Sequence, residues 1–259
     1  MLNTIENLYA RLFSRRYLQR INNQLLNMCL RARGYNNYRN NRESGESFFI
    51  ECILAPKNPK ICFDIGANIG NYSRELLEKT NAIVYAFEPL SSAYTILVTA
   101  LSEYRERLVP FNKGVGAENN TLTIHYSPSE LELASFSEEV KNISFVTNEM
   151  KEDVGVVTLD SYCEENLITA IDFIKIDTEG FEYEVFLGAL ETFRKLQPKF
   201  IQIEFNWHQL FRNTTLNCFA EYLPNYDVYQ LIFEGWRKRD PKDPLTNIYH
   251  YSNFVFVRR

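Results

Sequence analysis

Apolar residues follow two different periods along the chain, and these separate an N-terminal segment from the remainder. In the first 30 residues they recur at helical spacing, which predicts one or two amphipathic helices. They are Ile5, Leu8, Leu12, Leu18, Ile21, Leu25 and Cys29. The stretch 34–45 is polar and has no period, so it predicts a loop, with a lid over a site as a further interpretation. We therefore divide the chain into a helical appendage with its loop, residues 1–45, and a main domain, residues 46–259.

Beyond residue 46, short apolar runs alternate with helical patterns. A short helix is predicted from Ser47 to about Leu54. The runs that predict strands are 61–65, 82–89, 108–116, 121–127, 154–160, 172–177, 200–206, 226–233 and 253–259. Strands that alternate with helices form right-handed crossovers. We expect an α/β, Rossmann-like fold with a mainly parallel seven-stranded sheet, an antiparallel end and helices on both faces. The clean alternation of 121–127 predicts an antiparallel strand, and residues 128–153 are an insertion rich in Glu and Ser.

Charge limits the classes of partner. Residues 1–45 hold eight arginines and two acids, a net charge of +6, whereas the remainder carries −11. An acidic main domain argues against a nucleic-acid partner, which would require a basic face. Arginines 11, 15, 16 and 20 lie among the apolar positions of the N-terminal helices. They predict peripheral contact with anionic lipid, a carrier-linked glycan or a protein; the alternative is a helix packed on the main domain.

Cysteine usage and the lack of long apolar runs bear on location. The five cysteines form no CxxC pair and no zinc-type cluster, which is typical of reduced cytoplasmic proteins. No apolar run approaches the roughly 18 residues that span a bilayer. The first 16 residues lack the apolar core of a signal peptide. We expect a cytoplasmic protein without a transmembrane segment, and make no prediction of its oligomeric state.

The segment FDIGANIGNYS carries the first candidate chemistry. A strand that contains Asp64 turns through Gly66 and Gly70 into a helix, the form of a nucleotide-type site. A dinucleotide fingerprint needs glycine at three positions, but two of them hold Asn68 and Asn71. An acid at the strand end and amides at a helix N-terminus instead suit an ammonium and a carboxylate. S-adenosylmethionine has both groups on its methionine end.

Glu88 supports the same cofactor. It lies 24 residues after Asp64, at the end of the second strand, where an acid can bind both ribose hydroxyls. The alternatives are a turn cap for Asp64 and an exposed acid before a proline for Glu88. Two acids and two glycines in register at successive strand ends favour the cofactor.

Further stretches resemble the FkbM-type family of class I S-adenosylmethionine-dependent methyltransferases. They are YAFEP, NKGVG, TLDSYCEENLITAIDFIKIDTEGFEYEVFLGA and IQIEFN, of which IDFIKIDTEGFE is the most specific. The resemblance covers roughly residues 45–205. It implies a class I methyltransferase fold for residues 46–259 and O-methylation of a hydroxyl, often on a sugar or secondary metabolite. The residues it implies for cofactor binding are Asp64, Gly66, Ala67, Asn68, Gly70, Asn71, Glu88, Pro89, Asn112, Val115, Gly116 and Asp177.

Methyl transfer to a hydroxyl requires positioning and a base near the carboxyl ends of the strands. The candidate catalytic residues are Asp177, Glu179, Glu204 and His208. An acid that ends a buried strand, as Asp177 does, is costly without a partner. The alternative for Glu179 is a helix cap, and for His208 a core or surface role. Lys175 is expected to pair with an acid and is given no catalytic role.

A divalent metal is an alternative at the same place. Oxygens of Asp177, Glu204 and Asn206 would suit Mg²⁺. The resemblance requires no metal, however, and hydrogen bonds to the hydroxyls of an acceptor are favoured.

The sequence thus predicts an S-adenosylmethionine-dependent O-methyltransferase that acts on a sugar, glycan or similar polyhydroxylated small molecule. Two other classes stay open: an N-methyltransferase of a small molecule or protein, and a non-catalytic, partner-binding module of the same fold. Aromatic faces that could stack on a sugar ring are Tyr35, Tyr38, Trp207 and Trp236.

Overall fold

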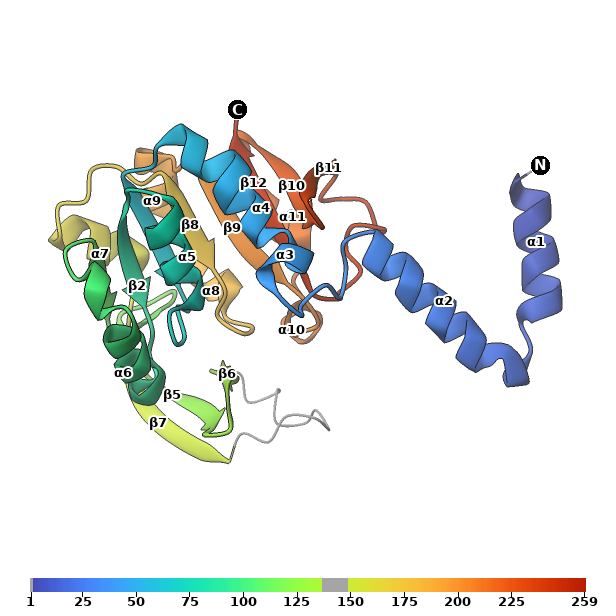
Figure 1. Ribbon diagram of the computed structural model, residues 1–259, viewed down its shortest axis with the longest axis horizontal. Helices are drawn as coiled ribbons and strands as arrows, with labels where there is room; N and C mark the ends of the chain where they lie inside the picture. Colours follow the sequence, from blue (N-terminus) through green and yellow to red (C-terminus); the bar gives the residue numbers. More distant parts are fainter. Residues whose placement is uncertain (1, 137–148) are drawn as a thin grey trace.

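The computed structural model describes residues 2–136 and 149–259, and its centre is an eight-stranded sheet (Figure 1). In spatial order the strands are β11 (Gly235–Arg239), β10 (Tyr226–Ile232), β12 (Ser252–Arg258), β9 (Phe200–Phe205), β8 (Phe173–Ile176), β1 (Ile61–Ile65), β2 (Ile83–Phe87) and β3 (Leu108–Phe111). The five strands from β9 to β3 are parallel, and β12 pairs antiparallel with β9 and β10. The predicted Rossmann-like class I methyltransferase fold is confirmed.

The sheet has eight strands rather than the predicted seven, because β11 adds an edge. A two-residue turn, Phe233 and Glu234, folds β11 back onto β10, and Glu234 adopts a φ of +49°. The sequence of β11, GWRKR, is mostly charged and lacks the apolar run that predicts a strand. Charged side chains are typical of an exposed edge strand, where they discourage pairing with another chain.

A second sheet of four strands lies next to α6, below the larger sheet in Figure 1. Its order is β4 (Gly114–Val115), β7 (Met150–Val157), β5 (Asn120–Ser127) and β6 (Glu130–Ser135). The predicted strand 108–116 is therefore divided between two sheets, as β3 and β4. Antiparallel pairing of β5 with β6 and β7 confirms the expectation for 121–127. Within the predicted insertion, residues 137–148 lie outside the described residues.

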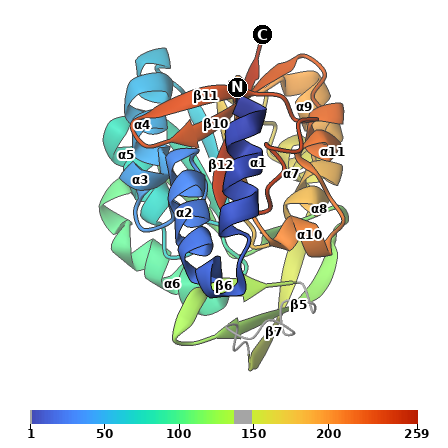
Figure 2. The same ribbon diagram turned by 90° about the vertical axis from the view of Figure 1, so that its right-hand side faces the viewer.

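Helices cover both faces of the larger sheet, with α4, α5 and α6 on one side and α7, α8, α9 and α11 on the other (Figure 2). Their bounds are α3 (Asn41–Ser44), α4 (Glu46–Phe48), α5 (Asn71–Lys79), α6 (Ser91–Ala100), α7 (Leu159–Glu165), α8 (Glu182–Leu187), α9 (Leu190–Leu196), α10 (His208–Phe211) and α11 (Leu216–Glu221). The predicted helix 47–54 is present as α4 followed by the π-helical η2 (Phe49–Leu54). Short 3-10 turns occupy η3 (Ala55–Lys57) and η4 (Ser102–Tyr104).

The N-terminal arm, residues 2–32, projects away from this body (Figure 1). It consists of α1 (Leu2–Phe13), the 3-10 turn η1 (Arg16–Leu18) and α2 (Gln19–Ala32), as the helical period predicts. Leu30 is its first residue in the core. The domain boundary at residues 45 and 46 stays a prediction. Among the described residues, none of the helices has the length and apolarity to span a bilayer.

Candidate active site

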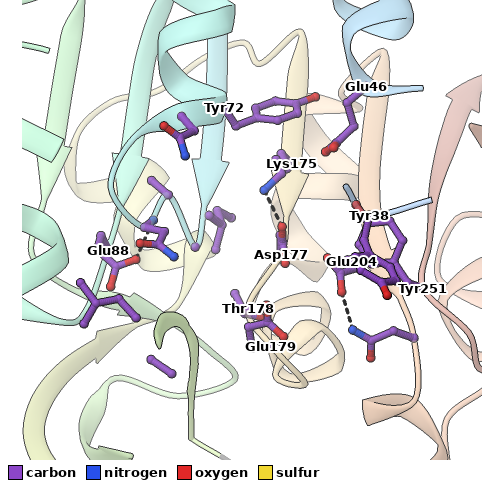
Figure 3. A pocket seen from close by; sticks show the side chains of 18 of the residues that line it. Tyr38, Glu46, Tyr72, Glu88, Lys175, Asp177, Thr178, Glu179, Glu204 and Tyr251 are labelled. Carbon is purple, nitrogen blue, oxygen red and sulfur yellow. Dashed lines mark hydrogen bonds and ion pairs between the residues drawn. The ribbon is translucent and has the colours of Figure 1, made fainter. Parts of the chain in front are cut away.

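A cavity of about 990 Å³ lies at the carboxyl ends of the parallel strands. Ten of the residues predicted for the site line it: Gly66, Ala67, Asn68, Asn71, Glu88, Pro89, Val115, Asp177, Glu179 and Glu204. Five others are not among the residues that line it: Asp64, Gly70, Asn112, Gly116 and His208. Figure 3 shows Glu88 on one side of the cavity, Asp177 near its middle and Glu204 on the other side. After the two reactants that the sequence predicts, we call these two sides the cofactor half and the acceptor half.

The glycine loop between β1 and α5 forms the wall of the cofactor half. The amides of Gly66 and Ala67 donate to the carbonyl of Phe87 at 3.0 and 2.9 Å, which joins the loop to the end of β2. A Cβ atom on Gly66 would lie 1.7 Å from the carbonyl oxygen of Asp177, and its φ is +83°. Only glycine therefore allows the loop to pass against the end of β8. Gly70, at φ +88°, then ends the loop and α5 begins.

Glu88 is held by backbone amides. Its two carboxylate oxygens accept hydrogen bonds from the amides of Asn68 and Leu90, each at 2.8 Å. Only 6% of the residue is exposed, and burial raises the pKa of Glu88 to about 7, although the two amides oppose the rise. Asn112 supports the same corner from behind, because its side chain donates to the carbonyl oxygens of Glu88 and Pro89.

Asp64 lies beneath the loop instead of facing the cavity. It is fully buried, and its carboxylate accepts a hydrogen bond from Ser73 at 2.6 Å. Its other oxygen is 3.9 Å from Nζ of Lys175, the residue opposite it in the β1–β8 register. Burial raises the pKa of Asp64, and the charge of Lys175 opposes that rise. The placement favours a role in supporting the loop from below.

Lys175 joins the two halves of the cavity. Its ammonium donates to Asp177 at 2.8 Å and lies 4.8 Å from the centre of the Tyr72 ring. Burial alone would lower the pKa of Lys175, but the carboxylates of Asp177, Asp64 and Glu46 outweigh burial and raise it. The expectation that Lys175 pairs with an acid is confirmed.

Acids dominate the acceptor half. Oxygen atoms of Asp177, Glu179 and Glu204 lie within 4.8 Å of one another. Burial, together with the neighbouring acids, raises the pKa of Glu204 well above its usual value. Nδ1 of His208 is 3.5 Å from Glu179, and burial lowers the pKa of His208 to about 4. His208 is thus a neutral side chain that packs behind Glu179.

Two hydrogen bonds tie the side chain of Asn206 to its neighbours. Its amide group donates to Glu204, and its carbonyl oxygen accepts from the backbone amide of His208 at 2.8 Å. The three acids together have the spacing for a cation, but a cluster of this kind is also common without one. Metal binding therefore stays the less favoured alternative.

The rim of the acceptor half comes from parts of the chain that the motifs do not cover. Tyr38 and Tyr251 meet edge to face, with ring centres 5.9 Å apart, and both line the cavity. Glu46 also lines it and accepts hydrogen bonds from Ser44 and Gln202. The predicted loop 34–45 supplies further lining residues: Asn36, Arg39, Asn40 and Asn41.

The four aromatic residues that the sequence suggested for sugar stacking lie in different parts of the structure. Tyr38 and Trp207 line the cavity. Tyr35 is fully buried and donates to the carbonyl of Thr246 at 3.0 Å, so it belongs to the core. Trp236 stacks on Tyr229, with ring centres 4.4 Å apart, on the distant β10–β11 hairpin.

Comparison with known proteins decides the family. A family model described as the methyltransferase FkbM domain matches residues 64–230, more than half of the chain. The chain belongs to the FkbM methyltransferase family. This FkbM protein is 26% identical over 192 residues to the 2-O-methyltransferase NoeI of Sinorhizobium fredii, which covers 68% of this chain and 75% of NoeI. It is 22% identical over 160 residues to the hexuronic acid methyltransferase AglP of Haloferax volcanii, which covers 61% of this chain and 62% of AglP.

Solved structures resemble the FkbM protein only distantly. An O-methyltransferase from Bacillus cereus matches with a TM-score of 0.46 and 10% identity over the whole of both chains. Fibrillarin from Methanococcus jannaschii matches with a TM-score of 0.46 and 13% identity, covering 85% of this chain and 76% of that one. Scores this low say nothing about a substrate. The family match establishes an S-adenosylmethionine-dependent methyltransferase.

The cofactor half fits S-adenosylmethionine in two respects. The side-chain oxygen of Asn68 is buried without a hydrogen-bond partner among the described residues, at the turn of the glycine loop. Each oxygen of Glu88 accepts one amide hydrogen bond and retains a lone pair for a ribose hydroxyl. The residues at this wall therefore suit a ligand that offers donors to both side chains.

Proposed function

We propose that this FkbM methyltransferase transfers a methyl group to a hydroxyl of a sugar or a similar polyhydroxylated acceptor. The observation that carries the proposal is the position of Asp177. Its backbone touches the glycine loop at Gly66, and its side chain lies among the acids of the acceptor half. Asp177 would thus lie beside both the cofactor and the acceptor.

The cofactor would be held by the glycine loop, Asn71, Glu88 and Val115. When bound, S-adenosylmethionine supplies an electrophilic methyl group. Glu88 would accept hydrogen bonds from the two ribose hydroxyls, because its backbone donors fix the carboxylate in place. Its negative charge also disfavours a ligand with a 2′-phosphate.

Asp177 would accept the hydrogen bond of the acceptor hydroxyl and take its proton during transfer. Lys175 donates to one oxygen of Asp177, Oδ2, which orients the carboxylate and leaves the other oxygen for the hydroxyl. A positioned base of this kind typically contributes a factor of about 10²–10⁴ to the rate. Glu179 and Glu204 would bind neighbouring hydroxyls of the acceptor.

The lining of the rim supports a sugar. Amides at Asn36 and Asn40 can bond hydroxyls, and the rings of Tyr38 and Tyr251 offer faces for a pyranose. The names of the relatives NoeI and AglP refer to 2-O-methylation and to hexuronic acid methylation. The acid cluster would also suit an amine, so N-methylation is the second candidate.

Mass spectrometry with methyl-labelled S-adenosylmethionine and a panel of sugars tests the proposal. We expect label on an oxygen of a sugar, and a label on nitrogen would support the second candidate instead. Asp177→Asn should lower kcat by about 100-fold or more. Asp153→Asn, which removes the same charge from an exposed position on β7, should keep the wild-type rate. An unchanged rate in Asp177→Asn would contradict the role of Asp177 as the base. Loss of activity on exhaustive chelation would support a divalent metal in the site.

A further inference from the structure

The N-terminal arm exposes its apolar face to solvent. From Thr4 to Cys29 no residue is buried. Leu8 is 56% exposed, Leu12 54%, Ile21 48% and Leu25 43%. Together with the exposed Ile5 and Met28 they recur at three- and four-residue intervals, so each helix presents a continuous apolar stripe.

Among the residues that the structure describes, few contacts stabilise this arrangement. The side chain of Asn22 accepts a hydrogen bond from the Tyr9 hydroxyl at 2.8 Å and donates to the carbonyl of Phe13 at 3.0 Å. These bonds fix the angle between α1 and α2 but bury no apolar stripe. Isolated helices of about 12–15 residues are marginal in water. The apolar face therefore needs an occupant that covers it.

The charge of the arm identifies the chemistry of that occupant. Residues 7–42 contain eight arginines and no lysine, aspartate or glutamate. Four of these arginines, 11, 15, 16 and 20, flank the bend between α1 and α2. In the part of the chain that the structure describes, none of the four forms an ion pair. A basic amphipathic helix with aromatic residues at its apolar face is the pattern that binds anionic lipid.

We infer that the arm lies in the headgroup region of an anionic lipid surface, with its apolar stripes in the acyl boundary and its arginines at the phosphates. The bend of the arm lies at the level of β6 and α10, the end of the sheet where the cavity is found (Figures 1 and 2). The arginine-rich bend therefore lies at the active-site end of the molecule, whereas α1 extends from it toward the level of β11 (Figure 1).

A second copy of the chain is the main competing occupant. The acidic body would attract the arm, but its exposed apolar residues are scattered over different elements, such as Ile96 on α6, Leu167 after α7 and Leu190 on α9. Within the described residues these positions offer no apolar stripe to match the arm. Two arms packed together would cover the apolar stripes, but residues 7–42 contain no acid that could pair with their arginines. The lipid surface satisfies both the apolar stripes and the charge.

Co-sedimentation of the full-length protein with vesicles tests the inference. We expect binding to vesicles of phosphatidylglycerol and phosphatidylcholine, and little binding to phosphatidylcholine alone. The triple variant R15Q/R16Q/R20Q should bind about 100-fold more weakly, since each arginine near an anionic surface contributes about fivefold. The variant K57Q/R105Q/K242Q removes the same charge from exposed positions on the body and should bind like the wild type.

The variant L8Q/L12Q separates the apolar contribution from the charge, and it too should bind about 100-fold more weakly. Its circular dichroism and methyl transfer in solution should match the wild type, because the arm lies outside the body. Equal losses in the arm and body triple variants would overturn the inference. So would a dimer in sedimentation equilibrium that L8Q/L12Q dissociates. Vesicle binding is measured without cofactor or acceptor, so its result tests the lipid contact separately from the proposed methyl transfer.

Discussion

Replacing Lys175 with methionine tests how the buried charges of the active site are balanced. The ammonium is 2.8 Å from Asp177 and 3.9 Å from Asp64, and the Lys175 side chain is only 6% exposed. A cation about 4 Å from a carboxylate is worth about 4 kcal/mol at an effective dielectric constant near 20, before the cost of desolvation. Removing one partner of a buried ion pair costs about 3–5 kcal/mol. We expect a loss of this size in the free energy of unfolding at pH 8.

The loss should depend on pH in a defined direction. Burial raises the pKa of Asp64, and Lys175 opposes that rise, so Lys175→Met should raise it further. When the pKa of an acid is higher in the folded state than in the unfolded state, the free energy of unfolding falls as the pH rises from the unfolded-state pKa through the folded-state pKa. The deficit of the variant should therefore be smaller at pH 5 than at pH 8.

Urea denaturation at the two pH values, followed by tryptophan fluorescence, measures this effect. The matched control is Lys199→Met, because within residues 2–136 and 149–259 the one hydrogen bond of Lys199 Nζ is to the backbone carbonyl of Arg258, at 2.7 Å. Loss of one such bond should cost about 1 kcal/mol and should not vary with pH. A deficit for Lys175→Met below about 1 kcal/mol, or one equal at both pH values, would refute the charge balance described here.

Three further predictions concern the cavity walls. Burial raises the pKa of Glu88 to about 7, so calorimetry should show S-adenosylmethionine binding about tenfold more weakly at pH 6 than at pH 8. Equal affinities at the two pH values would contradict the binding of the ribose by the Glu88 carboxylate. Gly66→Ala, whose Cβ would meet the carbonyl of Asp177, should lower stability by at least about 2 kcal/mol in thermal denaturation. Gly155→Ala should be nearly neutral, because its Cβ would meet Cγ of Lys113 at 3.9 Å, an ordinary contact. Because the pKa of His208 is lowered to about 4, the pH–rate profile from pH 5 to 8 should keep its shape in His208→Asn, and a lost inflection would make His208 a catalytic base.

Local patterns in the sequence predict the parallel half of the sheet and most of the cofactor half. The run that forms β1, the glycine loop and Glu88 follow one another in the chain, so their spacing carries the information. Asp64 shows the limit of prediction from local patterns. Its partner Lys175 is remote in sequence and is brought opposite it only by the register of β1 and β8. A single sequence does not encode that register in any local pattern, and Asp64 was therefore expected to face the ligand.

The acceptor half was predicted less completely for a related reason. Tyr38 and Glu46 precede the first strand of the sheet and Tyr251 directly precedes the last, yet all three line one cavity. Only the placement of β12 between β9 and β10 brings Tyr251 to that rim. The chain between these residues carries the recognisable motifs, whereas the rim depends on tertiary packing. This is the part of the site that a motif leaves unassigned.

The position of β12 also has a consequence for synthesis and quality control. β12 follows every other strand of the larger sheet in sequence, yet it lies inside the sheet, between β9 and β10. Until residues 252–258 leave the ribosome, β9 has an unpaired edge and the β10–β11 hairpin has no place to attach. An unpaired apolar edge invites aggregation and capture by chaperones. A chain interrupted before β12 would carry all the cofactor-loop residues and still expose this edge.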